Sequence, residues 1–131
     1  MGANEDVVLI LHNIARIDLA TARLDDADRL FRESLEEARA IGYREIIAYC
    51  LEGLGEIAFA NEDLDRAARL IGASEGLFDE LGVPMQDNEG ESYARTVEEL
   101  RESMGAAFET ARREGQQLSS GDAIELALAR G

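Results

Sequence analysis

The residue types best suited to chemistry are few in this chain, and most of them are acidic. Glu52 and Glu56 stand four residues apart, so a helix would place both carboxylates on one face. Two carboxylates that close can divide an acid–base task, one protonated and the other ionised. A solvated helix face, or a face that contacts a partner, explains the pair more simply. We adopt that interpretation for it, and for Glu33 and Glu37, which repeat the spacing.

His12 and Cys50 are each the only residue of their type. A single histidine excludes a metal site built on two histidines of one chain, and any nucleophile–histidine pair would have to include His12. No such constellation is visible around it, so we interpret His12 as a surface or groove histidine without a catalytic role. Cys50 lies within an apolar helical pattern, which favours a buried packing thiol over a reactive one.

The sequence supports metal binding and nucleotide binding no better than it supports catalysis. The acidic cluster Asp25, Asp26 and Asp28 lacks the glycine turn and the terminal glutamate of a calcium-binding loop. It suits the first turn of a helix, where the helix dipole favours negative charge. The chain has no phosphate-binding loop and no lysine with which to build one in its usual form. The sequence therefore predicts a protein that is not an enzyme and that uses no metal and no cofactor.

Composition narrows the class of partner. The 131 residues include 28 acidic and 13 basic side chains, all 13 of them arginine, for a formal net charge of −15. Such a charge repels nucleic acids and anionic lipid surfaces. No apolar run approaches the ~20 residues of a membrane span, and a lone cysteine suits a reducing compartment. We expect a cytoplasmic protein that binds neither nucleic acid nor membrane directly.

An internal repeat organises the chain. Residues 51–82 align with residues 11–42 at ten identical positions, and a match at a fixed offset indicates stacked helical hairpins. Gly42 and Gly82 end the two units as candidate helix C-caps, and Asp63 is a candidate N-cap. Within each unit, small residues stand where the two helices of a hairpin are expected to cross. These pairs are Ala15 with Ala27, and Gly55 with Ala67.

The patterns together predict an all-α fold that forms one domain over residues 1–131. The unit resembles the tetratricopeptide repeat, although its period is longer than the usual ~34 residues, and implies a short solenoid of antiparallel hairpins. Ser119 with Asp122 resembles a capping box that begins a last short helix. About seven helices are expected, at about 5–22, 25–41, 44–61, 64–81, 90–103, 105–115 and from about 120. They would form hairpins over 5–42, 44–82 and 90–115, with a capping helix over 120–130.

Two segments of the second half carry a family resemblance. "ARLIGASEGLFDELGVP", Ala68 to Pro84, and "MGAAFETARREGQQLSSGDAIELAL", Met104 to Leu128, resemble the C-terminal region of bacterial LuxR-type transcriptional regulators and of related signal-transducing predicted ATPases. The resemblance implies a regulatory protein-interaction segment that belongs beside a nucleotide-binding module. Arg112 departs from the family pattern, because that position usually carries tryptophan, so the last helices are expected to pack differently.

The first predicted helix is apolar on nearly every side. In "DVVLILHNIARIDLA", Val7, Leu11 and Ile14 form one stripe, and Ile10 with Ile17 form another. A helix that is apolar all round is buried all round, whereas the end helix of a solenoid needs a polar outer face. We therefore expect an earlier repeat, or self-association, to cover this helix.

The first helix of each hairpin should line the concave surface of such a stack. Helical spacing places a mixture of apolar, aromatic and charged side chains there, which suits recognition of a protein or peptide partner. An ordinary solvated face is the plain alternative. Two other functions stay open: a stand-alone oligomerising adaptor, and a small-molecule sensor with a pocket between hairpins. The candidate groove residues are Leu9, His12, Arg16, Leu19, Tyr49, Glu52, Glu56 and Phe59.

Overall fold

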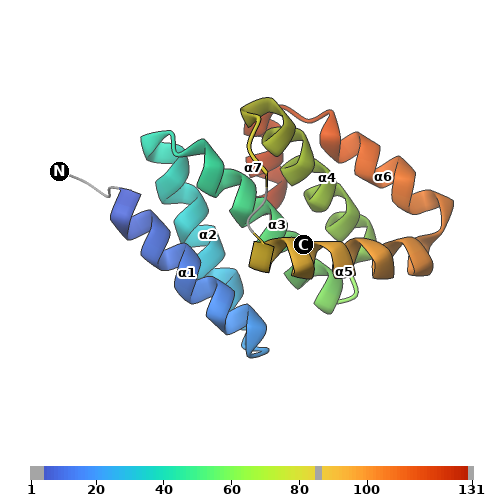
Figure 1. The fold of residues 1–131 in the computed structure, drawn as a ribbon, viewed down its shortest axis with the longest axis horizontal. Coiled ribbons are helices and arrows are strands. Elements are labelled where there is room, and N and C mark those ends of the chain that lie inside the picture. Colours follow the sequence, from blue (N-terminus) through green and yellow to red (C-terminus); the bar gives the residue numbers. More distant parts are fainter. Residues whose placement is uncertain (1–4, 85–86, 130–131) are drawn as a thin grey trace.

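The computed structural model describes residues 5–84 and 87–129, and over these residues the chain is all-α, as predicted (Figure 1). Seven helices account for nearly all of the described chain, and no strand occurs among them. Their bounds are α1 Glu5–Ala20, α2 Leu24–Ile41, α3 Arg44–Ala60, α4 Leu64–Leu81, α5 Asp87–Met104, α6 Ala106–Gln116 and α7 Ser120–Leu128.

The first four helices form the two predicted hairpins. Each helix packs against the next along the chain, α1 on α2, α2 on α3 and α3 on α4. Gly42 and Gly82 end α2 and α4 in the left-handed conformation, with φ of 74° and 70°, which confirms both predicted C-caps. Large apolar side chains of α2, α3 and α4 fill the core, among them Phe31, Leu51 and Leu70, none of which is exposed.

Asp63 occupies the N-cap position of α4, as predicted, but its side chain does not cap the helix, and the backbone shows why. Asp63 precedes α4 with φ of −92° and ψ of 76°, and its side chain makes no capping hydrogen bond. Arg23 has nearly the same angles before α2, so this turn caps by side chain in neither unit. Ser119, by contrast, has the extended conformation of an N-cap residue, with ψ of 160°, and its hydroxyl accepts from the Asp122 amide at 3.1 Å. The cap predicted at Ser119 is confirmed.

The last three helices do not repeat the packing of the first four. Gly105, with φ of 62° and ψ of −134°, turns the chain sharply between α5 and α6, and the two helices meet at an angle (Figure 1). The main contact of α6 is with α4. Helix α7 packs on α2, α3 and α4, and the guanidinium groups of Arg32 and Arg66 donate at 2.9 Å to carbonyls at its C-terminal end. Cations at this end of a helix complement its dipole.

Arg112 of α6 links three helices through its guanidinium group. Its guanidinium donates to Glu75 of α4 at 2.8 and 2.6 Å and lies 5.4 Å from the centre of the Phe108 ring. The Tyr93 hydroxyl of α5 donates to the same Glu75 carboxylate. A charged and polar cluster of Arg112, Glu75 and Tyr93 therefore joins α4, α5 and α6. No helix in the described ranges is long and apolar enough to cross a membrane.

Candidate functional site

A groove of about 830 Å³ runs between α1, α3 and α5. We call it the α1–α3–α5 groove. Its lining residues come from α1, the turn that follows it, the first residue of α2, and from α3 and α5. Its lining is mixed: apolar and aromatic groups stand beside charged groups of both signs. The lining residues are Asn13, Arg16, Leu19, Ala20, Ala22, Leu24, Glu56, Phe59, Ala60, Ser92, Arg95, Thr96 and Glu99.

The eight residues predicted for a concave groove divide into two sets. Arg16, Leu19, Glu56 and Phe59 line the α1–α3–α5 groove. The other four do not: Leu9 is exposed toward the N-terminal end of α1, while His12, Tyr49 and Glu52 are buried. Neighbouring elements cover the buried set. His12 packs on Phe31 of α2 and Tyr49 of α3, and Glu52 accepts from the Arg16 guanidinium.

Glu52 and Glu56 are not a solvated face, and the interpretation adopted from the sequence is wrong for this pair. Glu52 has no exposed surface and Glu56 is 8% exposed. The guanidinium of Arg16 donates to Glu52 Oε1 at 2.8 Å and reaches Glu56 Oε2 at 3.5 Å. The Ser92 hydroxyl of α5 donates to Glu56 Oε1. One cation and one hydroxyl thus hold two carboxylates beneath the groove.

Burial favours the protonated form of Glu52. Desolvation raises the pKa of Glu52 well above its ordinary value, and the hydrogen bond and charge of Glu56 raise it further, against the opposing effect of Arg16. A raised pKa favours a proton held on Glu52, through which the two carboxylates can hydrogen-bond. Over the described part of the chain, no group of three or more histidine, cysteine or acidic side chains could hold a metal ion.

His12 is buried in an aromatic cluster, so the prediction of a surface or groove histidine is wrong. Its ring centre lies 5.7 Å from those of Phe31 and Tyr49, and the Tyr49 ring lies 4.8 Å from that of Phe78. Burial lowers the pKa of His12 to about 4, and the charge of Arg16 lowers it too, against a hydrogen bond with Asn13. The imidazole is therefore neutral near pH 7.

Mild acid should weaken the fold through His12. In the unfolded chain the imidazole has its ordinary pKa of 6.5 and binds a proton below that pH. In the folded protein it stays neutral until the pH falls to about 4. Stability is therefore lost as pH falls from above 6.5, by about 2 kcal/mol between pH 7.5 and pH 5 for this residue alone. His12→Leu should remove that loss. Urea unfolding of both proteins at the two pH values checks it, and a difference that did not change with pH would contradict a neutral buried His12.

Cys50 is buried, as predicted. Desolvation raises the pKa of its thiol to about 12, against a hydrogen bond with Ser34 and the charge of Arg16. The thiolate that reacts or binds metal is therefore scarce at neutral pH. Cys50 contributes packing between α2 and α3.

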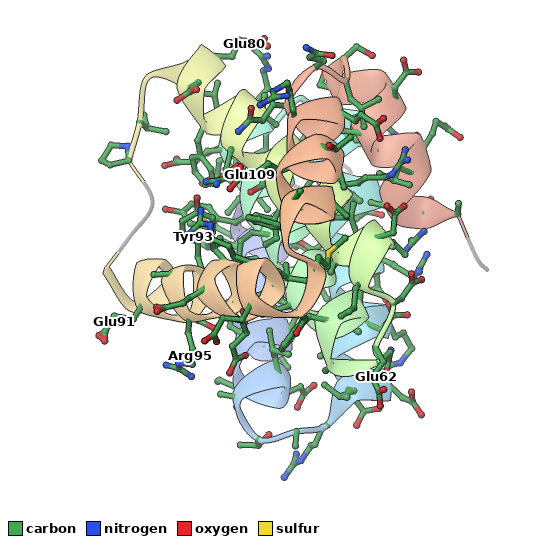
Figure 2. All side chains as sticks on the ribbon, turned by 90° about the vertical axis from the view of Figure 1, so that its right-hand side faces the viewer. Glu62, Glu80, Glu91, Tyr93, Arg95 and Glu109 are labelled. Carbon is green, nitrogen blue, oxygen red and sulfur yellow. The ribbon has the colours of Figure 1, made fainter. Side chains whose placement is uncertain are left out.

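The sequence reasoning missed the contribution of α5 to the groove. Ser92, Arg95 and Glu99 recur at helical spacing in "ESYARTVEEL", which places them on one face of that helix. Figure 2 shows Tyr93 and Arg95 leaving opposite sides of α5, Tyr93 toward the α4–α6 side and Arg95 away from it. The periodicity was available in the sequence, but the position of α5 across α3 depends on tertiary packing.

Comparison with known proteins identifies no relative of this chain. No protein-family model matches the chain, and neither a curated protein nor a solved structure matches it.

Proposed function

We propose that the chain is a non-catalytic, tetratricopeptide-like interaction module that binds a peptide or helix of a partner protein in the α1–α3–α5 groove. The observation that carries the proposal is the lining of this groove. Leu19, Leu24 and Phe59 offer apolar contact, while Arg95 and Glu99 of α5 offer charges of both signs. Peptide grooves combine apolar anchor sites with a few polar groups that fix orientation.

The buried charges beneath the groove support a binding role more than a catalytic one. Glu52 is sealed from solvent, and Glu56 already has two partners in Arg16 and Ser92. Groups held this way keep one geometry, so the floor of the groove is rigid before a partner arrives. A preformed floor lowers the entropy cost of binding.

The groove is tested by two variants that leave the buried network intact. Peptides that bind the full chain would first be selected from a displayed random library. We expect the Phe59→Ala and Arg95→Glu proteins to bind these peptides about tenfold or more weakly than the unchanged chain does, as hot-spot truncations do. Arg113→Glu is the matched control, since it makes the same charge change on an exposed part of α6. Fluorescence anisotropy gives the affinities.

Three outcomes of that selection would count against the groove. They are equal binding by all three variants, loss of binding in Arg113→Glu as well, and failure to select any peptide. Tyr49→Ala and Glu52→Ala are poorer probes, because both side chains are buried and their removal would disturb the fold.

We further propose that the module is the C-terminal sensor or scaffold region of a bacterial LuxR-type transcriptional regulator or signalling ATPase. The support is the resemblance of Ala68–Pro84 and Met104–Leu128. The size of the native polypeptide discriminates this from a stand-alone adaptor. An immunoblot of source-cell extract would show a band several-fold larger than 14.3 kDa for a regulator, and a band at 14.3 kDa for an adaptor.

A further inference from the structure

The outer face of α1 carries an exposed apolar stripe. Val7, Ile10, Ile14 and Ile17, spaced by three, four and three residues, lie along one side of the helix and are 42%, 56%, 43% and 61% exposed. We call these four residues the α1 stripe. Helix α1 lies at one edge of the molecule, with α2 on its inner side (Figure 1). The fold buries the opposite face of α1, through Val8 and Ala15, and leaves the stripe uncovered.

The internal repeat shows what such a stripe does. Forty residues later, the equivalent positions on α3 are Ile47, Cys50, Leu54 and Ile57, and all four are buried. They belong to the same buried cluster as Phe31 and Leu35 of α2, the helix that α3 packs against. In this fold, therefore, the same pattern of positions serves as a face for antiparallel helix packing.

We propose that a second copy of this chain covers the α1 stripe, with the two α1 helices packed antiparallel about a two-fold axis. The stripe is self-complementary in that arrangement. An axis beside residue 12 sets Val7 of one copy against Ile17 of the other, and Ile10 against Ile14. Such isologous contacts are the usual way in which identical subunits bury one shared patch.

Over the described residues, no other surface of a second copy is better suited to cover the α1 stripe. Among the described residues, the large apolar side chains exposed outside α1 are Ile41 and Leu118, on separate parts of the molecule. A partner helix that resembles α2 would fit α1 less well than α2 fits α3, because α1 has Asn13 at the position where α3 has Gly53. A Cβ at Gly53 would lie 2.4 Å from the Phe31 ring, so α2 approaches α3 more closely than it could approach α1.

Charge at the two ends of α1 selects the antiparallel orientation. Glu5 and Asp6 begin the helix, and Arg23 follows its end. The Arg23 side chain is 67% exposed and, among the described residues, makes only a long ion pair, 3.8 Å, with Asp18 of its own chain. Antiparallel packing brings the acidic end of one helix toward Arg23 of the other, whereas parallel packing would gather four carboxylates. Two copies of charge −15 still repel each other at long range, so the dimer should tighten as salt screens that repulsion.

Sedimentation equilibrium of the full chain tests the proposal. We expect a dimer whose dissociation constant rises about a hundredfold or more in Ile14→Glu, because the two-fold axis places the unpaired charge in the seam twice. Ile14 is already exposed in the monomer, so the fold should survive, and circular dichroism checks this. Ile41→Glu is the control and should remain dimeric. A chain that is monomeric at millimolar concentration, or a dimer that Ile14→Glu leaves intact, would overturn the proposal.

Cysteine pairing tests the orientation separately. In a mixture of Val7→Cys and Ile17→Cys proteins, mild oxidation should give the mixed disulfide and little of either symmetric one, since disulfides need Cα atoms within about 7 Å. The native Cys50 is buried and does not interfere. Symmetric disulfides in place of the mixed one would overturn the antiparallel arrangement.

Discussion

Replacing Gly72 with alanine should lower the free energy of unfolding by about 2 kcal/mol. A Cβ at Gly72 would lie 2.0 Å from the carbonyl oxygen of Arg112 in α6, and one at Gly115 would lie 2.1 Å from the carbonyl oxygen of Arg69 in α4. Both obstacles are backbone atoms, so α4 and α6 would have to separate. Overpacking costs about 1–3 kcal/mol, and a backbone obstacle that cannot move aside places this case at the upper end of that range. The better helix propensity of alanine returns about 1 kcal/mol, which leaves a net loss of about 2 kcal/mol. Gly115→Ala should behave in the same way.

Gly90→Ala is the matched control for these two changes. Gly90 also lies within a helix, α5, and a Cβ there meets nothing within 4 Å. With no overpacking, the same substitution should stabilise the protein by about 0.5–1 kcal/mol. Urea unfolding followed by circular dichroism gives all three values. If Gly72→Ala proved as stable as Gly90→Ala, α4 and α6 would not pack as closely as the structure places them.

The sequence predicted small residues at one kind of crossing and missed them at another. The repeat pointed to Gly55 with Ala67 inside a hairpin, and both lie in the core of the α3–α4 pair, where a Cβ at Gly55 would come 3.2 Å from Ile71. Gly72 and Gly115 belong to a contact between α4, in the second repeat unit, and α6, which lies outside both units. That contact depends on how α5 turns away at Gly105, which no periodicity within α4 or α6 reveals.

The candidate site shows the same division between local and tertiary information. Helical spacing correctly placed Glu52 and Glu56 on one face of α3, but their burial depends on Arg16, 36 residues earlier, and on Ser92 of α5. A carboxylate pair at this spacing usually faces solvent, because burying it without a cation costs several kcal/mol. The sequence carries the cation, but the sequence alone does not show that α1 and α3 bring the three groups together.

Removing that cation should therefore be among the most damaging single changes in the protein. We expect Arg16→Met to cost about 3–5 kcal/mol of unfolding free energy, the usual penalty for breaking a buried ion pair from one side. Methionine keeps much of the side-chain length and apolar contact, so the loss reports on charge. Glu52→Gln alone should cost less than about 1 kcal/mol of unfolding free energy. Glu56 still accepts a hydrogen bond from Arg16, and the neutral amide replaces a carboxyl group that burial already keeps in its protonated form.

The pH dependence of Arg16→Met separates lost charge from lost packing. Without the guanidinium, burial and Glu56 act unopposed to raise the pKa of Glu52. A group whose folded pKa is raised stabilises the fold below its unfolded pKa, and that stabilisation is lost as pH rises through the folded value. The Arg16→Met protein should therefore regain part of its lost unfolding free energy as the pH falls from 8 to 5. The double variant Arg16→Met with Glu52→Gln should be more stable than Arg16→Met at pH 8. It should also gain less stability as the pH falls. If the single and double variants lost the same stability at pH 8, with the same slope, the role of Arg16 would be packing and the carboxylate pair would not depend on its charge.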